Sequence, residues 1–244
     1  MPAPKTLRLA ETALFADLDG TLAPLEATPG AVKPNDARRR LLDDLSEALG
    51  GRLAVVSGRA LADLDRVLER RVAAVGAVHG LVRRTADGRV IAAPRGARMG
   101  EALTAFRTFA ARDRGLLVED KGAAITLHYR LAPEAADAGR ALARRLAAEL
   151  GLTVQDGDMV VELRAEGPDK GGAVEAFMAE PPFAGFRPVF VGDDLTDEHG
   201  FAAARAQGGF GVVVGARRPT AALYALSDVG AVQQWLRRAL ERGA

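Results

Sequence analysis

Two carboxylates follow an apolar run close to the start of the chain. Residues 13–22 read ALFADLDGTL. An apolar run that ends in polar residues and a glycine is typical of a buried strand whose carboxyl end opens onto a site. Because Asp17 and Asp19 are two residues apart, they would share one side of a strand, and charges so close need a cation or a shared proton. The structural alternative is a strand followed by an ordinary Asp-Gly turn.

Two later apolar runs also end in polar residues. The run 53–56 is followed by SGR, and the run 188–191 is followed by GDDLTDE. The carboxyl ends of parallel strands meet at one edge of a sheet, so Asp17, Ser57 and Asp193 should converge. Hard oxygen ligands without cysteine suit Mg²⁺, which commonly bridges phosphoryl oxygens. The pattern therefore predicts a magnesium site that handles a phosphate.

The same segments contain groups that can hold an anion. Ser57 supplies a hydroxyl, and the amides of Gly20 and Gly58 can approach an anion closely because glycine has no Cβ atom. Lys170 adds a positive charge at the start of a predicted helix. Each group has a structural alternative: Ser57 and the paired aspartates of the last motif as helix caps, and Lys170 as a solvated first-turn residue.

The elements that must position these groups alternate between strand and helix. Strands are expected at 13–16, 53–56, 72–78, 188–191 and 210–214. Helices are expected at about 34–49, 60–69 and 233–240; another helix begins near residue 170, and a separate one follows residue 198 and ends near residue 206. Strands that alternate with helices build a parallel sheet with right-handed crossovers.

This alternation is interrupted in the middle of the chain. A hairpin is expected at 84–91, helices at about 98–111 and 133–150, and strands at 116–121, 123–130, 153–155 and 159–164. We therefore predict an α/β fold in two parts. Residues 1–80 and 166–244 form a Rossmann-like parallel-sheet core, and residues 81–165 form an inserted α+β domain.

Composition narrows the function classes. The chain has 244 residues, of which 48% are hydrophobic and 27% charged, with a net charge of +1 and no cysteine. This balance, with 5% aromatic residues, argues against a nucleic-acid partner. Disulfides and thiolate metal sites are excluded, and no run approaches the roughly 20 apolar residues of a membrane span. We expect a cytoplasmic, monomeric protein with no membrane partner.

Four motifs in order resemble those of the haloacid-dehalogenase superfamily of phosphatases: DLDGTL at 17–22, SGR at 57–59, Lys170, and GDDLTDE at 192–198. Within that superfamily the chain is most similar to the trehalose-6-phosphate phosphatases, over nearly its whole length. The resemblance implies a HAD-like core with a mobile C2-type α/β cap that selects the substrate. It places this cap at the interruption, in residues 81–165.

The resemblance also implies catalytic roles. Asp17 would be the nucleophile that takes the phosphoryl group, and Asp19 would be the general acid and base, oriented by Thr21. Ser57 and Lys170 would hold the phosphoryl oxygens.

By the same resemblance, Mg²⁺ would bind the Asp17 side chain, the Asp19 carbonyl and Asp193. Asp194 and Asp197 would hold metal-bound waters and Lys170.

The substrate contacts implied by the resemblance come from both parts of the chain: Gly20, Ser57, Gly58, Arg59, His79, Gly80, Glu119, Lys121, Glu162 and Lys170. A buried histidine bonded to backbone is the alternative for His79, and a solvated sheet of alternating charges is the alternative for the cap residues. His128 and Arg130 would brace the cap. The loop after Arg164 departs from the family's pattern.

We therefore predict an Mg²⁺-dependent phosphatase that hydrolyses trehalose 6-phosphate to trehalose and phosphate, the last step of trehalose biosynthesis. The alternatives are another sugar phosphatase of the superfamily (for sucrose phosphate or mannosylglycerate phosphate), a phosphosugar mutase, or a non-catalytic sugar-phosphate-binding relative.

Overall fold

The computed structural model describes residues 1–157, 159–216 and 219–243. The chain divides into two compact units, one of residues 1–91 and 168–244 and one of residues 92–167. Within the described part of the chain, no helix has the length and apolar character that crossing a membrane requires.

The first unit is built on an eight-stranded sheet. From one edge to the other the strands are β12 (Tyr224–Leu226), β11 (Phe210–Val214), β10 (Arg187–Gly192), β1 (Thr12–Ala16), β2 (Leu53–Val56), β3 (Ala74–Ala77), β4 (Val82–Arg84) and β5 (Val90–Ala92). All pairs from β12 to β3 are parallel, and β4 runs antiparallel to β3. The predicted α/β class and parallel-sheet core are confirmed.

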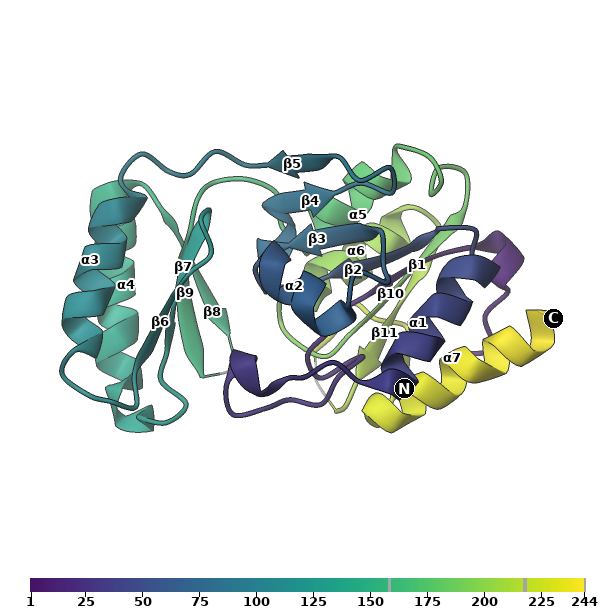
Figure 1. Ribbon diagram of the computed structural model, residues 1–244, viewed down its shortest axis with the longest axis horizontal. Coiled ribbons are helices and arrows are strands. Elements are labelled where there is room, and N and C mark those ends of the chain that lie inside the picture. Colours follow the sequence, from purple (N-terminus) through teal and green to yellow (C-terminus); the bar gives the residue numbers. More distant parts are fainter. Residues whose placement is uncertain (158, 217–218, 244) are drawn as a thin grey trace. The chain divides into compact units, whose positions relative to one another are not determined.

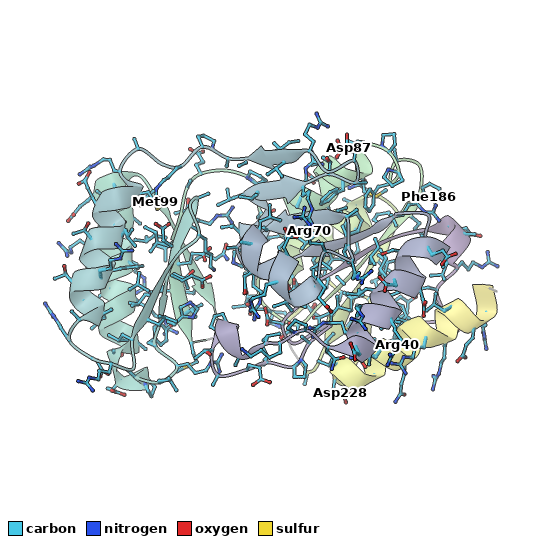
Figure 2. The ribbon with its side chains drawn as sticks, viewed as in Figure 1. Arg40, Arg70, Asp87, Met99, Phe186 and Asp228 are labelled. Atoms are coloured by element: carbon cyan, nitrogen blue, oxygen red, sulfur yellow. The ribbon has the colours of Figure 1, made fainter. Side chains whose placement is uncertain are left out.

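Along the chain, helices lie between or after the strands of this sheet. They are α1 (Asp36–Ala48), α2 (Leu61–Leu68), α5 (Lys170–Met178), α6 (Asp197–Ala206) and α7 (Val229–Gly243), with short 3-10 turns η1 (Leu9–Glu11), η2 (Pro29–Ala31) and η3 (Val78–Gly80). Figure 1 shows α5 next to α6, and α1 beside the yellow α7. Side-chain caps start α1, α5 and α7: Asn35 accepts a hydrogen bond from the Arg38 amide, Asp169 accepts one from the Gly172 amide, and Asp228, labelled in Figure 2, accepts one from the Ala231 amide.

Aromatic packing fixes α5 and α6 on the central strands. The Phe15 ring of β1 lies 6.1 Å from that of Phe177 and 5.4 Å from that of Phe183, centroid to centroid. Phe190 of β10 meets Phe201 of α6 edge to face at 5.7 Å. Successive strand residues face opposite sides, so alternate residues of β1 pack on these helices.

The second unit is an antiparallel sheet with two helices. Its strand order is β6 (Leu117–Asp120), β7 (Ala124–His128), β9 (Val160–Arg164), β8 (Thr153–Gly157), and its helices are α3 (Met99–Ala110) and α4 (Ala136–Leu150), with the turn η4 (Pro133–Ala135) before α4. Figure 1 shows α3 and α4 side by side. Met99, labelled in Figure 2, is buried with Phe106, Ile125 and Leu163 in the core of this unit.

The hairpin predicted as the start of the inserted domain belongs to the first unit. Its strands β4 and β5 extend the core sheet, with Asp87 (Figure 2) at the turn between them. Residues 81–91 therefore lie with the core, and the inserted unit spans 92–167 instead of 81–165. Strand β12 was not predicted, and α7 begins at Val229 instead of residue 233.

Candidate active site

Three aspartates of the first unit converge at the carboxyl edge of its sheet. Ala16, the last residue of β1, pairs in register with Val191 of β10, and the Asp17 amide donates to the Val191 carbonyl at 2.9 Å. This register places Asp17 beside the loop after β10. Carboxylate oxygens of Asp17, Asp193 and Asp197 all lie within 4.8 Å of one another. The predicted convergence is thus present for Asp17 and Asp193, and Asp197 joins them.

Lys170 lies between two of these carboxylates. Its Nζ atom is 3.1 Å from Asp17 Oδ1 and 2.6 Å from Asp197 Oδ1, and its side chain is 2% exposed. Burial alone would lower the pKa of Lys170, but the charges of Asp17 and Asp197 outweigh it and raise that pKa. The lysine is therefore a fixed positive charge. Asp169 holds it at the start of α5 by accepting the Gly172 amide at 2.9 Å.

Asp197 organises the loop after β10. While its Oδ1 atom binds Lys170, its Oδ2 atom accepts the amides of Asp193 and Asp194, each at 2.9 Å. Both oxygens are thus engaged by donors from the protein. Asp17 and Asp193 are the better metal ligands, and Asp197 is suited to the supporting role that the resemblance implied.

The acids around Lys170 carry an excess of negative charge. Burial, together with neighbouring carboxylates, raises the pKa of Asp17 well above its ordinary value. Burial likewise raises the pKa of Asp193 to about 7, with the charge of Asp197 adding to it. A cation against Asp17 and Asp193 would offset this cost, and carboxylate and carbonyl oxygens suit a hard divalent metal ion. The residues present therefore fit a bound divalent cation.

The loop that follows Asp17 packs against Asp193. Gly20 has φ +75°, and a Cβ atom there would lie 2.1 Å from Asp193 Oδ2. The Thr21 hydroxyl donates to Asp193 Oδ1 at 3.4 Å. The resemblance implied that Thr21 orients Asp19, but in the structure the Thr21 hydroxyl binds Asp193 of the fourth motif instead.

Asp19 is held by an arginine. The guanidinium of Arg59 approaches it as a fork, with Nε 2.6 Å from Oδ2 and Nη2 2.7 Å from Oδ1. Arg59 was expected among the substrate contacts. In the structure its hydrogen bonds go to Asp19, Asp63 and the Pro29 carbonyl.

The second motif lies at the end of β2. The side chain of Ser57 is buried, and its Oγ atom accepts the Arg59 amide at 3.4 Å. The His79 ring lies over Gly58, where a Cβ atom would be 2.4 Å from His79 Nε2. Gly80, at φ +105°, allows the same turn to approach the Asp169 carbonyl, because a Cβ atom there would be 2.4 Å from that oxygen. Gly58 and Gly80 thus pack the second motif against the start of α5.

The second unit carries a polar cluster of its own. Lys121 Nζ lies 2.7 Å from Glu162 Oε2, which also accepts the Thr126 hydroxyl at 2.5 Å. Glu119 Oε2 lies 3.1 Å from His128 Nε2. Burial alone would raise the pKa of Glu119, but the hydrogen bond to His128 and the charge of Lys121 outweigh it and lower that pKa.

The register of the antiparallel strands explains this cluster. Glu119 pairs with Thr126, and Thr126 pairs with Glu162, so the three form a row across the sheet. Ile125 and Leu163, which alternate with them, face the apolar core of the unit. The predicted residues Glu119, Lys121 and Glu162 are therefore on the polar face. Thr126 was not predicted, although its place in the alternation of β7 was a signal for it.

Arg164 and Arg130 lie close in sequence to residues of this cluster. Arg164 Nη1 donates to Gln155 Oε1 at 3.0 Å, across the β8–β9 pair. Arg130 follows β7, two residues beyond His128.

Comparisons with known proteins give the relatives of this chain. A family model described as trehalose-phosphatase matches residues 15–229. A probable trehalose-phosphate phosphatase of Sinorhizobium fredii is 40% identical over 210 residues, covering 83% of this chain and 77% of that protein. The trehalose-6-phosphate phosphatase of Escherichia coli is 39% identical over 230 residues, covering 93% of this chain and 86% of that protein.

Solved structures share the fold. The C-terminal domain of the C. albicans trehalose-6-phosphate phosphatase superposes with a TM-score of 0.85 over 99% of both chains, at 21% identity. A sugar phosphatase and a further phosphatase of the HAD superfamily share the fold at 12% and 16% identity. From the matched residues 15–229 and the two relatives at 39% and 40% identity, the chain belongs to the trehalose-phosphatase family.

Proposed function

We propose that this chain is a Mg²⁺-dependent phosphatase that hydrolyses trehalose 6-phosphate to trehalose and phosphate. The observation that carries the proposal is the Asp17–Lys170–Asp193 cluster at the carboxyl edge of the core sheet, in a chain belonging to this family. Asp17 and Lys170 are buried in it, and Asp193 is half-buried. A buried nucleophile beside a fixed cation is what attack on a phosphate ester requires, since the attacking group and the ester are both anionic.

Phosphoryl transfer would take place on Asp17. A carboxylate oxygen of Asp17 forms a bond to phosphorus while the bond from phosphorus to the sugar oxygen breaks, and Asp19 gives its proton to that oxygen. Asp19 then takes a proton from a water molecule that attacks the aspartyl phosphate. This second step releases phosphate and restores both carboxyl groups.

Other residues of the first unit would bind the phosphoryl group and the cation. Lys170 and Ser57 hold phosphoryl oxygens, and the amides of Gly20 and Gly58 can approach them closely. Asp17, Asp193 and the Asp19 carbonyl would hold Mg²⁺. The ion would neutralise the negative charge that gathers as phosphorus is attacked.

The polar face of the second unit would bind the sugar. Glu162 and Glu119 present carboxylate oxygens, and Lys121 places a positive charge near both. Such a combination can accept hydrogen bonds from vicinal hydroxyls and donate hydrogen bonds to them. The cation–carboxylate pair of Lys121 and Glu162 is nearly buried, which holds both groups in a set geometry. We assign the choice of sugar to this unit.

A substrate panel tests the proposal. Phosphate release is measured with trehalose 6-phosphate, sucrose 6-phosphate, mannosylglycerate phosphate and glucose 6-phosphate, with Mg²⁺ or with EDTA. The expected result is a clear preference for trehalose 6-phosphate that EDTA abolishes. A preference for another sugar would refute the substrate assignment, and activity that is unchanged in EDTA would refute the metal.

The nucleophile is tested by Asp17→Asn. The variant should lose turnover by at least about 10³-fold, because an amide oxygen is a poor nucleophile, and it should still bind the sugar phosphate in calorimetry. Retention of full activity would contradict the role of Asp17.

A further inference from the structure

Arg59 is almost fully bound by the protein. Besides the fork to Asp19, its Nη1 atom donates to the Pro29 carbonyl at 2.9 Å and to Asp63 Oδ2. These are four hydrogen bonds from a group with five N–H donors. The Arg59 side chain is 8% exposed. A guanidinium engaged in this way is suited to holding Asp19, and less suited to binding a sugar.

Asp63 supports this arginine from α2. It lies four residues after Arg59, and its other oxygen, Oδ1, accepts Nε and Nη2 of Arg66 at 3.0 and 2.5 Å. Arg66 in turn donates from Nη1 to the Val32 carbonyl at 3.1 Å. Asp63 thus lies between two arginines, both of which also bind backbone carbonyls of the segment 29–32.

The charges of this chain of groups alternate. Asp19 and Asp63 flank the guanidinium of Arg59, and their hydrogen bonds and charges outweigh the effect of burial and raise its pKa. Bidentate arginine–carboxylate pairs fix direction as well as charge, because both groups are planar. A long arginine side chain that is bound at Nη1 loses little further freedom when its other edge forms the fork.

On the basis of the proposed phosphatase function, we propose that Arg59 and Asp63 are positioning residues: Asp63 fixes the guanidinium of Arg59, and Arg59 fixes the Asp19 carboxyl group for proton transfer. Arg59 is thereby reassigned from substrate contact to support of the general acid and base. Asp63 has no role in any sequence motif of the chain and acts only through Arg59.

Leaving-group dependence separates this role from a structural one. The value of kcat/KM reports the steps up to departure of the leaving group. A sugar alkoxide needs a proton from Asp19, whereas p-nitrophenolate leaves readily without one. Asp63→Asn should therefore lower kcat/KM about tenfold for trehalose 6-phosphate and less than about twofold for p-nitrophenyl phosphate. Arg59→Ala should show the same selectivity with a loss of about 10²-fold for the sugar phosphate.

Asp65→Asn is the matched control. Asp65 is on the same helix, is similarly exposed (22% against 23%), and also binds a buried arginine, Arg84, at 2.6 Å. Arg84 binds the carbonyls of Val72 and Ala73 and does not bind Asp19. Asp65→Asn should lower the melting temperature about as much as Asp63→Asn while the ratio of the two kcat/KM values stays at that of the wild type.

The double variant Arg59→Ala/Asp63→Asn tests whether Asp63 acts through Arg59. Its kcat/KM should equal that of Arg59→Ala alone. The proposal is overturned if Asp63→Asn slows both substrates equally, if Asp65→Asn shows the same selectivity, or if the double variant is slower still.

These experiments distinguish failure of the proposed phosphatase function from failure of the positioning roles of Arg59 and Asp63. If the wild type prefers another alkyl phosphate, the same ratio is measured with that substrate, and only the sugar assignment falls. If the wild type hydrolyses no phosphate monoester, the positioning proposal falls together with the function.

Discussion

Gly20 and Asp193 lie so close together that a Cβ atom at position 20 would be 2.1 Å from Asp193 Oδ2. The residues are far apart in the sequence, and the contact brings the loop after β1 against the loop after β10. Position 20 also has φ +75°, which favours glycine. The missing side chain therefore allows the two loops to form one site.

We expect Gly20→Ala to lower turnover at least about 10²-fold, because Asp193 must move away from Asp17 and Lys170. Gly88→Ala is the control, since Gly88 has φ +89° and nothing within 4 Å of the added Cβ atom. It shares the backbone strain without the collision. Steady-state kinetics and melting temperature of both variants check this, and equal loss of activity in the two would contradict it.

Removal of Lys170 should destabilise the protein. Lys170→Met leaves Asp17 and Asp197 buried without their cation, and losing one partner of a buried ion pair costs about 3–5 kcal/mol. The free energy of unfolding in urea, measured without metal, checks this. Adding Asp197→Asn should recover part of the loss, and the exposed Lys33→Met should change stability by less than about 0.5 kcal/mol. No recovery in the double variant would show that the loss has another cause.

The metal-free protein should lose stability as the pH rises from about 4 to about 7. The pKa of Asp193 is raised from 3.8 to about 7 in the folded state, so folding favours its protonated form. The stability that this protonation contributes is fully present at a pH below the unfolded-state pKa of Asp193, and it is lost as the pH rises through the folded-state pKa. Melting temperatures in EDTA across this range check the direction.

Asp193→Asn removes the same titration. The variant should be more stable than the wild type in EDTA at pH 8 and nearly equal to it at pH 4, and Mg²⁺ should reverse the order at pH 8 by stabilising only the wild type. A wild type that is more stable than the variant in EDTA at pH 8 would contradict the assigned direction.

Glu162→Gln should impair sugar recognition. The amide keeps an acceptor for Thr126 but loses the charge that pairs with Lys121, so we expect KM for trehalose 6-phosphate to rise about tenfold. Hydrolysis of p-nitrophenyl phosphate, which has no sugar hydroxyls, should keep its kcat/KM. The control Glu101→Gln alters an exposed pair with Arg98 in the same unit and should change neither value. Equal losses with both substrates would place Glu162 outside sugar recognition.

Local patterns in the sequence predicted the strands and helices well, because the conformation of each of these elements depends mainly on residues close together in the chain. The apolar run before Asp17 is a strand buried on both faces, as its composition indicated. Alternation in the middle of the chain predicted the antiparallel strands. The motif acids were found because acidic residues directly after buried strands are easy to recognise.

Pairings between distant residues were decided only by the tertiary structure. Thr21 binds Asp193 instead of Asp19, since the parallel register of β1 and β10 brings the loop after β10 within reach of its hydroxyl. The local sequence does not indicate which carboxylates Arg59 binds. The direction of α2 and the packing of residues 29–32 bring its guanidinium to Asp19 and Asp63. The hairpin at 82–92 could have begun an inserted domain, but its hydrogen bonds to the edge of the core sheet place it in the first unit. The sequence thus determined which groups are present and on which element each lies, because strand and helix periods are local. Which groups meet depended on sheet register and helix packing, which are set by contacts between residues far apart in the chain.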